Sequence, residues 1–402
     1  MQSLLKISQQ TTWQILGKAV TSLSTFIILG LVARNYGEEG TGVFTLALTY
    51  LAIFYLLSDF GFNAHVLRKL KTQSSKLKNE WQRLLGARIV WAAILVVLAI
   101  GTLPFWPFTT SDFAQAVLFG SLAIVASAVF VTCNLMFQSK LRYDLSVIAS
   151  SSGTVFGLLV FIYLAGLKYP VPALLLAHLL GWITIALVAV VLVRKFWQVF
   201  SPIYDKRYTI NLFQTSWPIA ATLALNVIYF RADAFMIAYF RSSAEVGIYN
   251  VAYSVFQTAL VLPTFIMNAY YPMMLKSFKG ISLVAWGLLV VASFGTILTI
   301  TLAPPIIRIL TGGGFVGATS SLQILSLGFP AYFLSALLMW IMVTQGRYKL
   351  MLVIYAFGMV INLTLNFIYI PQYSFIAASY ITVISEYLIL AMQAVLLLTS
   401  RK

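Results

Sequence analysis

The chain has 402 residues, of which 61% are hydrophobic and only 9% are charged, and its mean hydropathy is +0.93. Soluble globular domains carry about 25% charged residues, so this composition excludes a water-surrounded domain and predicts an integral membrane protein. The net charge of +16 would suit nucleic acid, but the basic residues gather in every second polar loop. That distribution is typical of membrane topology, and we expect no nucleic-acid partner.

Apolar runs of about 20 residues alternate with short polar breaks, which indicates transmembrane helices rather than a β-barrel. Twelve spans are predicted, over residues 13–33, 42–65, 85–103, 113–137, 145–167, 171–193, 213–240, 246–271, 281–302, 321–344, 350–370 and 375–399. The loops between them are too short for a soluble catalytic domain. The N-terminal stretch MQSLLKISQQTTWQ shows no cleavable signal peptide and leads straight into the first span.

The basic residues predict the orientation of the chain in the membrane. The polar segments on one side hold 20 of the 26 Lys and Arg residues, while the loops on the other side hold only Arg34, Lys168, Arg241 and Arg308. This excess predicts a protein of the cytoplasmic (inner) membrane with both termini in the cytoplasm. The single cysteine, Cys133, cannot form a disulfide within the chain.

Two short matches at one offset indicate an internal repeat. Gly42-Val-Phe matches Gly247-Ile-Tyr, and Arg142-Tyr matches Arg347-Tyr, each at a shift of 205 residues. Each half holds an even number of spans, so both halves enter the membrane from the same side. They are therefore expected to be related by an axis along the membrane normal, as in one kind of transporter repeat.

We predict an N-terminal six-helix bundle over residues 1–200 and a C-terminal six-helix bundle over residues 201–402. The fold class is thus an all-α membrane protein with two pseudo-symmetric bundles around a central cavity. The functional interpretation is that the bundles rock about that cavity. The alternative is a duplication that is retained only for packing.

Two charges lie inside the seventh span, where a charge is costly unless it has a partner or lines a polar cavity. Arg231 and Asp233 are two residues apart and thus about 200° apart around a helix, so they do not form an intrahelical pair. Asn226 lies seven residues before Asp233 and shares its face. We predict that Arg231 faces the cavity, where it can bind a phosphate bidentately, and that a neighbouring helix holds Asp233. The reverse assignment remains open.

Four further ionisable residues lie within apolar runs: Lys18, Asp59, His178 and Glu386. Lys18 is shallow enough to extend to the interface or to serve the cavity. Asp59 either caps or hinges a helix end or gates the cavity. His178 is either a hydrogen-bonded structural group or a proton switch. Glu386 is the deepest, and it is either a neutral acid between helices or a cavity acid that responds to protons or cations.

No catalytic constellation appears in the sequence. His65 and His178 are the only histidines, and no metal-ligand spacing or nucleophile motif is present. The run Gly312-Gly-Gly lacks the Lys-Ser/Thr of a phosphate-binding loop. We therefore expect no enzyme activity, no cofactor and no metal site, and any transport must be coupled to an ion, to the substrate or to another subunit.

Several segments carry a family resemblance that extends over the whole chain in length, span number and loop pattern. They are Leu16-Gly-Lys-Ala-Val, Ala33-Arg-Asn-Tyr-Gly, Gly42-Val-Phe, Asp59-Phe-Gly-Phe, Arg231-Ala-Asp and Val246-Gly-Ile-Tyr-Asn-Val-Ala. These segments resemble the polysaccharide (O-antigen type) flippases of the multidrug/oligosaccharidyl-lipid/polysaccharide exporter superfamily. The resemblance implies a V-shaped pair of bundles that alternates between inward-open and outward-open states.

The same resemblance implies the cargo, an undecaprenyl-diphosphate-linked oligosaccharide that is moved between leaflets by way of a cationic, ion-coupled cavity. Lys18, Arg231 and Asn226 are the expected substrate-binding residues. The expected ion-coupling or gating residues are Asp59, Asp233, Glu386 and His178. The expected partners are the lipid-linked substrate, membrane lipids and a polysaccharide polymerase with other biosynthesis proteins.

Three other functions compete with the flippase. A multidrug or cation antiporter of the same superfamily is the alternative, because it would use cavity acids such as Asp59, Asp233 and Glu386. A flippase for peptidoglycan precursors is disfavoured, since those proteins usually carry two further helices. A membrane-embedded glycan polymerase or acyltransferase is disfavoured because the outer loops are poor in Arg and His.

Overall fold

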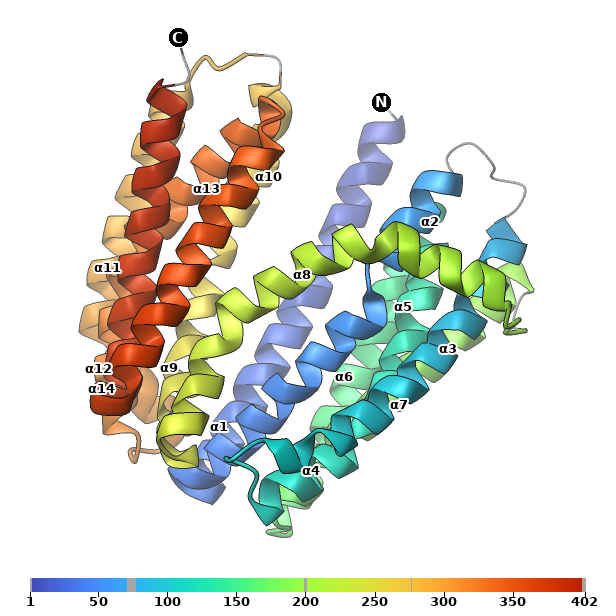
Figure 1. The fold of residues 1–402 in the computed structure, drawn as a ribbon, viewed down its shortest axis with the longest axis horizontal. Coiled ribbons are helices and arrows are strands. Elements are labelled where there is room, and N and C mark those ends of the chain that lie inside the picture. The colour runs from blue at the N-terminus through green and yellow to red at the C-terminus, as the bar shows by residue number, and fades with distance from the viewer. Residues whose placement is uncertain (1, 71–76, 199–200, 276, 400–402) are drawn as a thin grey trace. The chain divides into compact units, whose positions relative to one another are not determined.

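The computed structural model of the protein describes residues 2–70, 77–198, 201–275 and 277–399. Within its helices, the side chains of residues 2–11, 70, 222, 226–228, 268, 269, 272, 398 and 399 lie outside that description. The described residues form helices joined by short turns, and no strand occurs among them (Figure 1). The 3₁₀ turn Leu103–Phe105 is placed by the sequence Leu-Pro-Phe, because proline fits the first turn of a helix.

The α-helices follow one another along the chain with short connections. In chain order they are α1 (Gln2–Asp59), α2 (Phe62–Leu70), α3 (Leu77–Gly101), α4 (Ser111–Ser121), α5 (Ala123–Ser139), α6 (Tyr143–Gly166), α7 (Val171–Trp197), α8 (Lys206–Phe240), α9 (Ser243–Ala259), α10 (Val261–Met274), α11 (Ile281–Thr311), α12 (Val316–Ser326), α13 (Phe329–Thr344) and α14 (Tyr348–Thr399).

The described helices account for the twelve predicted spans. Eight helical stretches are long and apolar enough to cross a membrane, and two bent pairs, the two parts of α8 and α12 with α13, add two more. α1 and α14 are 58 and 52 residues long and break at Gly37 and Ser374. Since one crossing needs about 20 residues, each of these two helices crosses twice, which confirms the all-helical fold with twelve spans.

Most of the predicted boundaries need small corrections. The second span breaks at Phe60 and Gly61, before its predicted end, because both residues have a positive φ. The last two spans turn at Ser374, within the predicted break at residues 371–374, while Pro371 remains inside the helix. α3 begins at Leu77, eight residues before the predicted third span. Apolar content alone does not locate the start of a helix whose first turns are polar.

The chain packs into two compact units. The first comprises residues 1–36 and 43–228, and the second comprises residues 37–42 and 229–402. α8 belongs to the first unit up to residue 228 and to the second unit from residue 229. The predicted repeat boundary at residue 200 concerns the sequence symmetry and stays a prediction.

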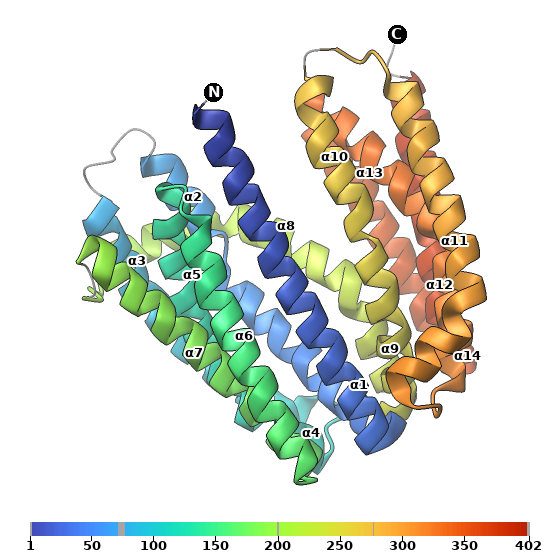
Figure 2. The ribbon, with the colours of Figure 1, turned by 180° about the vertical axis from the view of Figure 1, so that it is seen from behind.

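Within the first unit, α6 and α7 lie side by side (Figure 2). Their contact is set by glycines. Gly153 and Gly157, one helical turn apart on α6, lie against the backbone of Gly181 on α7, and a Cβ on Gly153 would overlap the Gly181 carbonyl. Small residues spaced by four let two membrane helices approach closely. This packing holds α7, and with it His178, in the first unit.

Within the second unit, α9, α12 and α14 pack around polar and aromatic contacts. The hydroxyl groups of Ser321 and Ser379 are 2.5 Å apart, between α12 and α14. The rings of Phe256 on α9 and Phe329 on α13 stack with their centroids 5.3 Å apart. These contacts fix the inner face of α14, on which the main polar cluster of this unit lies.

The two glycines that identified the repeat meet in the second unit. A Cβ on Gly42 would overlap the carbonyl of Ser243, and a Cβ on Gly247 would overlap the carbonyl of Glu38. Residues 37–42 of α1 therefore cross the first turns of α9 in direct backbone contact. Only glycine permits such an approach, so the two matched positions lie at one packing contact.

Candidate functional site

A buried polar group of the second unit surrounds Asp233 on α8, which is 3% exposed. Tyr249 of α9 donates its hydroxyl hydrogen to Asp233 Oδ2 at 2.6 Å, and Thr382 of α14 donates to the same oxygen at 3.0 Å. Asn366 Nδ2, also on α14, donates to Asp233 Oδ1 at 2.9 Å. The prediction that neighbouring helices hold Asp233 is confirmed.

A second row of amide and hydroxyl groups supports this arrangement. Asn366 also donates to Asn362 Oδ1 at 2.9 Å, and Asn362 donates to Ser385 Oγ at 3.1 Å. We call these residues the Asp233 cluster: Asp233, Tyr249, Asn362, Asn366, Thr382 and Ser385. Asn362 and Asn366 are one turn apart on α14, so they present their amides on one face.

The Asp233 cluster has the chemistry of a site for a proton or a hard monovalent cation. All partners of the carboxylate are neutral, and no cationic side chain among the described residues forms an ion pair with it. A buried carboxylate without a counter-charge is costly. The Oδ1 of Asn366 is also buried and has no hydrogen-bond partner among the described residues. Carboxylate, amide and hydroxyl oxygens suit hard cations rather than transition metals.

Arg231 lies two residues earlier on α8 and is half-buried. Its guanidinium carbon stands 6.0 Å from the centroid of the Tyr253 ring of α9, a cation–π contact. No carboxylate in the described part of the chain forms an ion pair with it. Arg231 and Asp233 therefore have separate partners, as their angular separation predicts.

Glu386 on α14 is the second buried acid of this unit, and its side chain is 3% exposed. Tyr229 of α8 donates its hydroxyl hydrogen to Glu386 Oε1 at 2.7 Å, and Tyr332 of α13 is a second hydroxyl partner. Glu386 thus lies between helices and has only neutral partners. This geometry fits both the structural and the ion-responsive interpretation.

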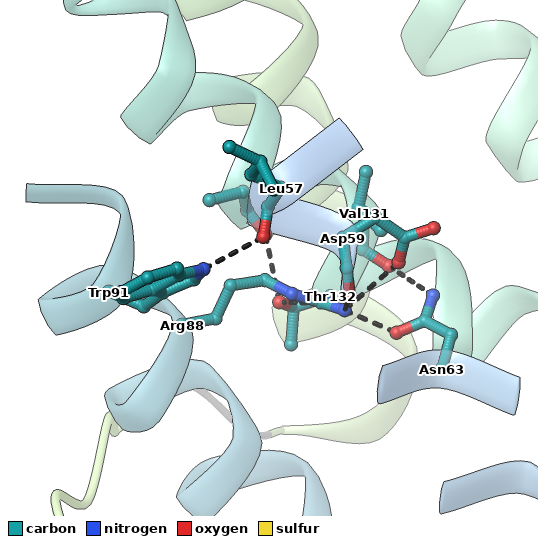
Figure 3. Close-up of polar contacts among 8 residues, drawn as sticks. Leu57, Asp59, Asn63, Arg88, Trp91, Val131 and Thr132 are labelled. Carbon is teal, nitrogen blue, oxygen red and sulfur yellow. Dashed lines mark hydrogen bonds and ion pairs between the residues drawn. The ribbon is translucent and has the colours of Figure 1, made fainter. Parts of the chain in front are cut away.

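In the first unit, Arg88 of α3 is completely buried, and Figure 3 shows its polar contacts. One of its terminal nitrogens donates to Asn63 Oδ1 at 3.0 Å and to Thr132 Oγ1 at 2.9 Å. The other donates to both the carbonyl and the carboxylate Oδ1 of Asp59, each at 3.2 Å. The guanidinium also stands over the Phe62 ring at 5.4 Å.

These contacts fix the break between α1 and α2. α1 ends at Asp59, and the next two residues, Phe60 and Gly61, have φ values of 48° and 72°. A Cβ on Gly61 would overlap the side chain of Ile219, so this turn requires glycine. Arg88 satisfies the last carbonyl of α1 and pairs with the Asp59 carboxylate. Asp59 therefore lies at a stapled helix break, and its side chain remains 38% exposed.

The sequence analysis did not single out Arg88, because it was counted among the 20 basic residues of the polar segments on one side. Its position three residues inside the predicted span 85–103 was the available signal. The structure corrects that assignment: Arg88 is a buried ion-pair residue and contributes nothing to the basic surface.

Replacing Arg88 by methionine is expected to lower the stability of the purified protein by about 3 kcal/mol, the lower end for a broken buried ion pair, because water reaches Asp59. The stability of the Arg88→Lys variant should lie between that of the wild type and that of Arg88→Met, since lysine lacks the planar fork. Thermal unfolding in detergent measures the change. Arg83→Met is the matched control on α3, because Arg83 forms an exposed pair with Asp205 at 3.6 Å. Equal losses in the two methionine variants would contradict the staple.

His178 on α7 lies in an aromatic group of the first unit. The Tyr55 hydroxyl and His178 Nε2 are 2.7 Å apart. The Tyr55 ring packs against Trp182 at 5.5 Å, and Phe130 contacts Trp182 at 6.3 Å. His178 is thus hydrogen-bonded, as its structural interpretation requires, and no other titratable side chain of the described residues is hydrogen-bonded to it.

The remaining predicted residues divide between the units. The Lys18 side chain on α1 is exposed and forms no ion pair among the described residues. The side chain of Asn226 lies outside the described residues. The structure brings Arg231, Asp233 and Glu386 into the second unit and Lys18, Asp59 and His178 into the first. A cavity shared by Lys18 and Arg231 stays a prediction.

Comparisons with known proteins agree with the helical architecture. A family model described as "Polysaccharide biosynthesis protein" matches residues 7–278, and a model described as MatE matches residues 218–368. A search of curated protein sequences finds no match.

Several solved structures share the fold. A structure of the lipid II flippase MurJ in an inward closed conformation matches with a TM-score of 0.78 at 13% identity, covering 96% of this chain and 87% of that one. An inward-facing multidrug resistance MATE family transporter of the MOP superfamily matches with a TM-score of 0.71 at 13% identity, covering 95% and 94%. The Vibrio cholerae MATE transporter VcmN, as a D35N mutant, gives a TM-score of 0.60 at 16% identity, covering 98% and 97%.

Proposed function

The chain belongs to the polysaccharide biosynthesis protein family, and on that premise we propose that it is a flippase. Its proposed cargo is an undecaprenyl-diphosphate-linked oligosaccharide, carried across the cytoplasmic membrane for the synthesis of surface polysaccharide. The observation that carries this proposal is Arg231, a half-buried guanidinium in a membrane helix with no carboxylate partner among the described residues. A diphosphate needs such a charge to leave water, and arginine binds phosphate bidentately.

The proposed mechanism is alternating access with ion coupling. The lipid tail stays in the bilayer while the charged head passes between the two six-helix halves, which change their relative arrangement during the cycle. Arg231 and Lys18, one in each half, compensate the diphosphate charge, and Asn226 contributes a polar contact. Both termini lie in the cytoplasm, because the basic loops lie on that side. The partners are membrane lipids and a polysaccharide polymerase.

The Asp233 cluster is the proposed ion-coupling site. A proton or a sodium ion that binds there neutralises the Asp233 carboxylate, and its release in the other state of the cycle lets an ion gradient drive transport. Glu386 is a second proposed acid of the coupling machinery. Asp59 and His178 act as gating residues, Asp59 through the stapled break of α1 and His178 through its hydrogen bond to Tyr55.

A multidrug or cation antiporter is the second candidate, supported by the MatE match over residues 218–368 and by the buried acids Asp233 and Glu386. A deletion strain distinguishes the two. The flippase proposal predicts loss of surface polysaccharide, restored by the wild-type gene. Intact surface polysaccharide together with increased sensitivity to cationic dyes would contradict it and favour the antiporter.

A further inference from the structure

Arg231 and Asp233 point from different faces of α8, yet two tyrosines of α9 connect them. Tyr249 and Tyr253 are four residues apart, so they lie one above the other on the same face of α9. Both side chains are buried, at 1% and 3% exposure. All four residues belong to the second unit.

The connection consists of three direct contacts. Tyr249 donates its hydroxyl hydrogen to Asp233 Oδ2 at 2.6 Å. The rings of Tyr249 and Tyr253 stack, with centroids 5.5 Å apart and planes inclined by 28°. The guanidinium of Arg231 stands over the other ring, 6.0 Å from the centroid of Tyr253. A carboxylate, two rings and a guanidinium thus form one continuous chain.

The first contact depends on the charge of Asp233. An ionised carboxylate accepts a strong hydrogen bond from a hydroxyl, and a bound proton or metal ion weakens that bond because it neutralises the charge of the acceptor. Tyr249 then has a second partner within reach, the hydroxyl of Thr382 at 3.5 Å. Glu386, the other buried acid of α14, takes its hydrogen bond from Tyr229 instead. Occupancy of the Asp233 cluster therefore acts on Tyr249.

The second and third contacts pass this change on to Arg231. Rings packed in a protein interior do not move independently, because the interior is close-packed. A tilt of Tyr249 therefore changes the position of the Tyr253 ring, whose negative face attracts the guanidinium. The orientation of Arg231 then depends on whether an ion occupies the Asp233 cluster.

We propose that Tyr249 and Tyr253 are positioning residues that couple ion binding at Asp233 to diphosphate binding at Arg231. This proposal rests on the proposed function, which supplies both ligands. It assigns a physical link to the coupling that an ion-driven flippase requires, and it gives α9 a role beyond packing. The test therefore measures the coupling between the two sites itself.

The test measures the affinity of the purified protein for farnesyl diphosphate, a short-chain lipid diphosphate, by calorimetry. Titrations are made with either Na⁺ or K⁺ as the only salt and at two pH values, so that the coupling ion is identified in the wild type. The wild type should show an affinity change of roughly 5- to 150-fold between the ion-bound and ion-free conditions. Reciprocity requires the probe to change the ion affinity by the same factor.

Tyr249→Phe removes only the hydroxyl group, and Tyr253→Leu removes the stacked ring together with its hydroxyl. Each variant should still bind the probe, while the coupling factor falls to near one. The double variant should lose no more of the coupling than either single variant does, because the two residues act in series. Tyr253→Phe keeps the ring and should retain the wild-type coupling, which a merely structural role of the hydroxyl would not predict.

Tyr50→Phe is the matched control, because Tyr50 is a buried tyrosine of the first unit whose hydroxyl bonds Ala99 and Thr102. It should leave the coupling unchanged. If Arg231→Ala weakens probe binding but Tyr249→Phe or Tyr253→Leu keeps the wild-type coupling, the inference is overturned while the proposed function stands. Absence of probe binding in the wild type, or unchanged binding in Arg231→Ala, would contradict the proposed function and the inference with it.

Discussion

Replacing Arg231 by alanine is expected to lower the transport of lipid-linked oligosaccharide roughly 10- to 100-fold. Hydrogen bonds to charged groups contribute about 1.5–3 kcal/mol, and each 1.4 kcal/mol corresponds to about a factor of ten. No other cationic side chain on the described part of α8 beyond residue 207 replaces it. The amount of surface polysaccharide in a complemented deletion strain measures the effect, at equal protein levels in the membrane.

Two variants control this result. Arg231→Lys keeps the charge but loses the planar fork, so it should retain an intermediate level of transport. Arg207→Ala removes the same charge from the exposed first turn of the same helix and should behave like the wild type. Full polysaccharide in a strain that carries Arg231→Ala would remove Arg231 from the mechanism.

Replacing Asp233 by asparagine is expected to abolish the response of transport to an ion gradient. Asparagine has nearly the same shape and can keep hydrogen bonds to Tyr249 and Thr382, whose hydroxyls also accept. It carries no charge, however, so it does not take up a proton in exchange and it offers a bound cation no negative charge to neutralise. Transport in vesicles is measured with a Na⁺ gradient at constant pH and with a pH gradient at constant Na⁺. The wild type should respond to one of them and the variant to neither.

Asp112→Asn controls for the general loss of a negative charge, because Asp112 is exposed in the first turn of α4. Its response to the gradients should equal that of the wild type. Glu386→Gln, measured under the same gradients, separates the contribution of Glu386 to the ion response from that of Asp233. If transport by the Asp233→Asn variant is still accelerated by the same gradient as in the wild type, the Asp233 cluster is structural.

Helical periodicity was enough to predict the separation of Arg231 and Asp233. At 100° per residue, two positions differ by about 200° whatever the surroundings are, and the structure gives the two residues separate partners. The partners themselves could not be predicted. Asn366 and Thr382 lie more than a hundred residues further along the chain, and only the packing of α14 against α8 brings them to Asp233.

Span number and membrane character were predictable because bilayer thickness dictates the length of each apolar run. The helix breaks were harder to predict from the sequence. Nothing in composition alone showed that α1 would stop at Asp59, since that depends on the positive φ at Phe60 and Gly61 and on Arg88 of another helix. A buried arginine close to a basic loop is easily counted as a loop residue. Arg88 was counted in this way.

The internal repeat was visible as two short matches, and it located a contact without indicating its nature. Gly42 and Gly247 were recognised as equivalent by their offset of 205 residues. Their close approach through Ser243 and Glu38 is a property of three-dimensional packing, which one sequence does not reveal. A glycine in a membrane helix signals close contact, but the partner helix has to be seen.

Transport of the lipid-linked oligosaccharide in proteoliposomes tests the flippase proposal most directly. The purified protein is reconstituted with undecaprenyl-diphosphate-linked oligosaccharide, and a membrane-impermeant glycan-modifying enzyme reports how fast the sugar appears in the outer leaflet. The wild type should accelerate that appearance over protein-free vesicles, and Arg231→Ala should return it close to the protein-free rate. Equal rates with and without the wild-type protein, under every ion gradient tested, would contradict the proposed function.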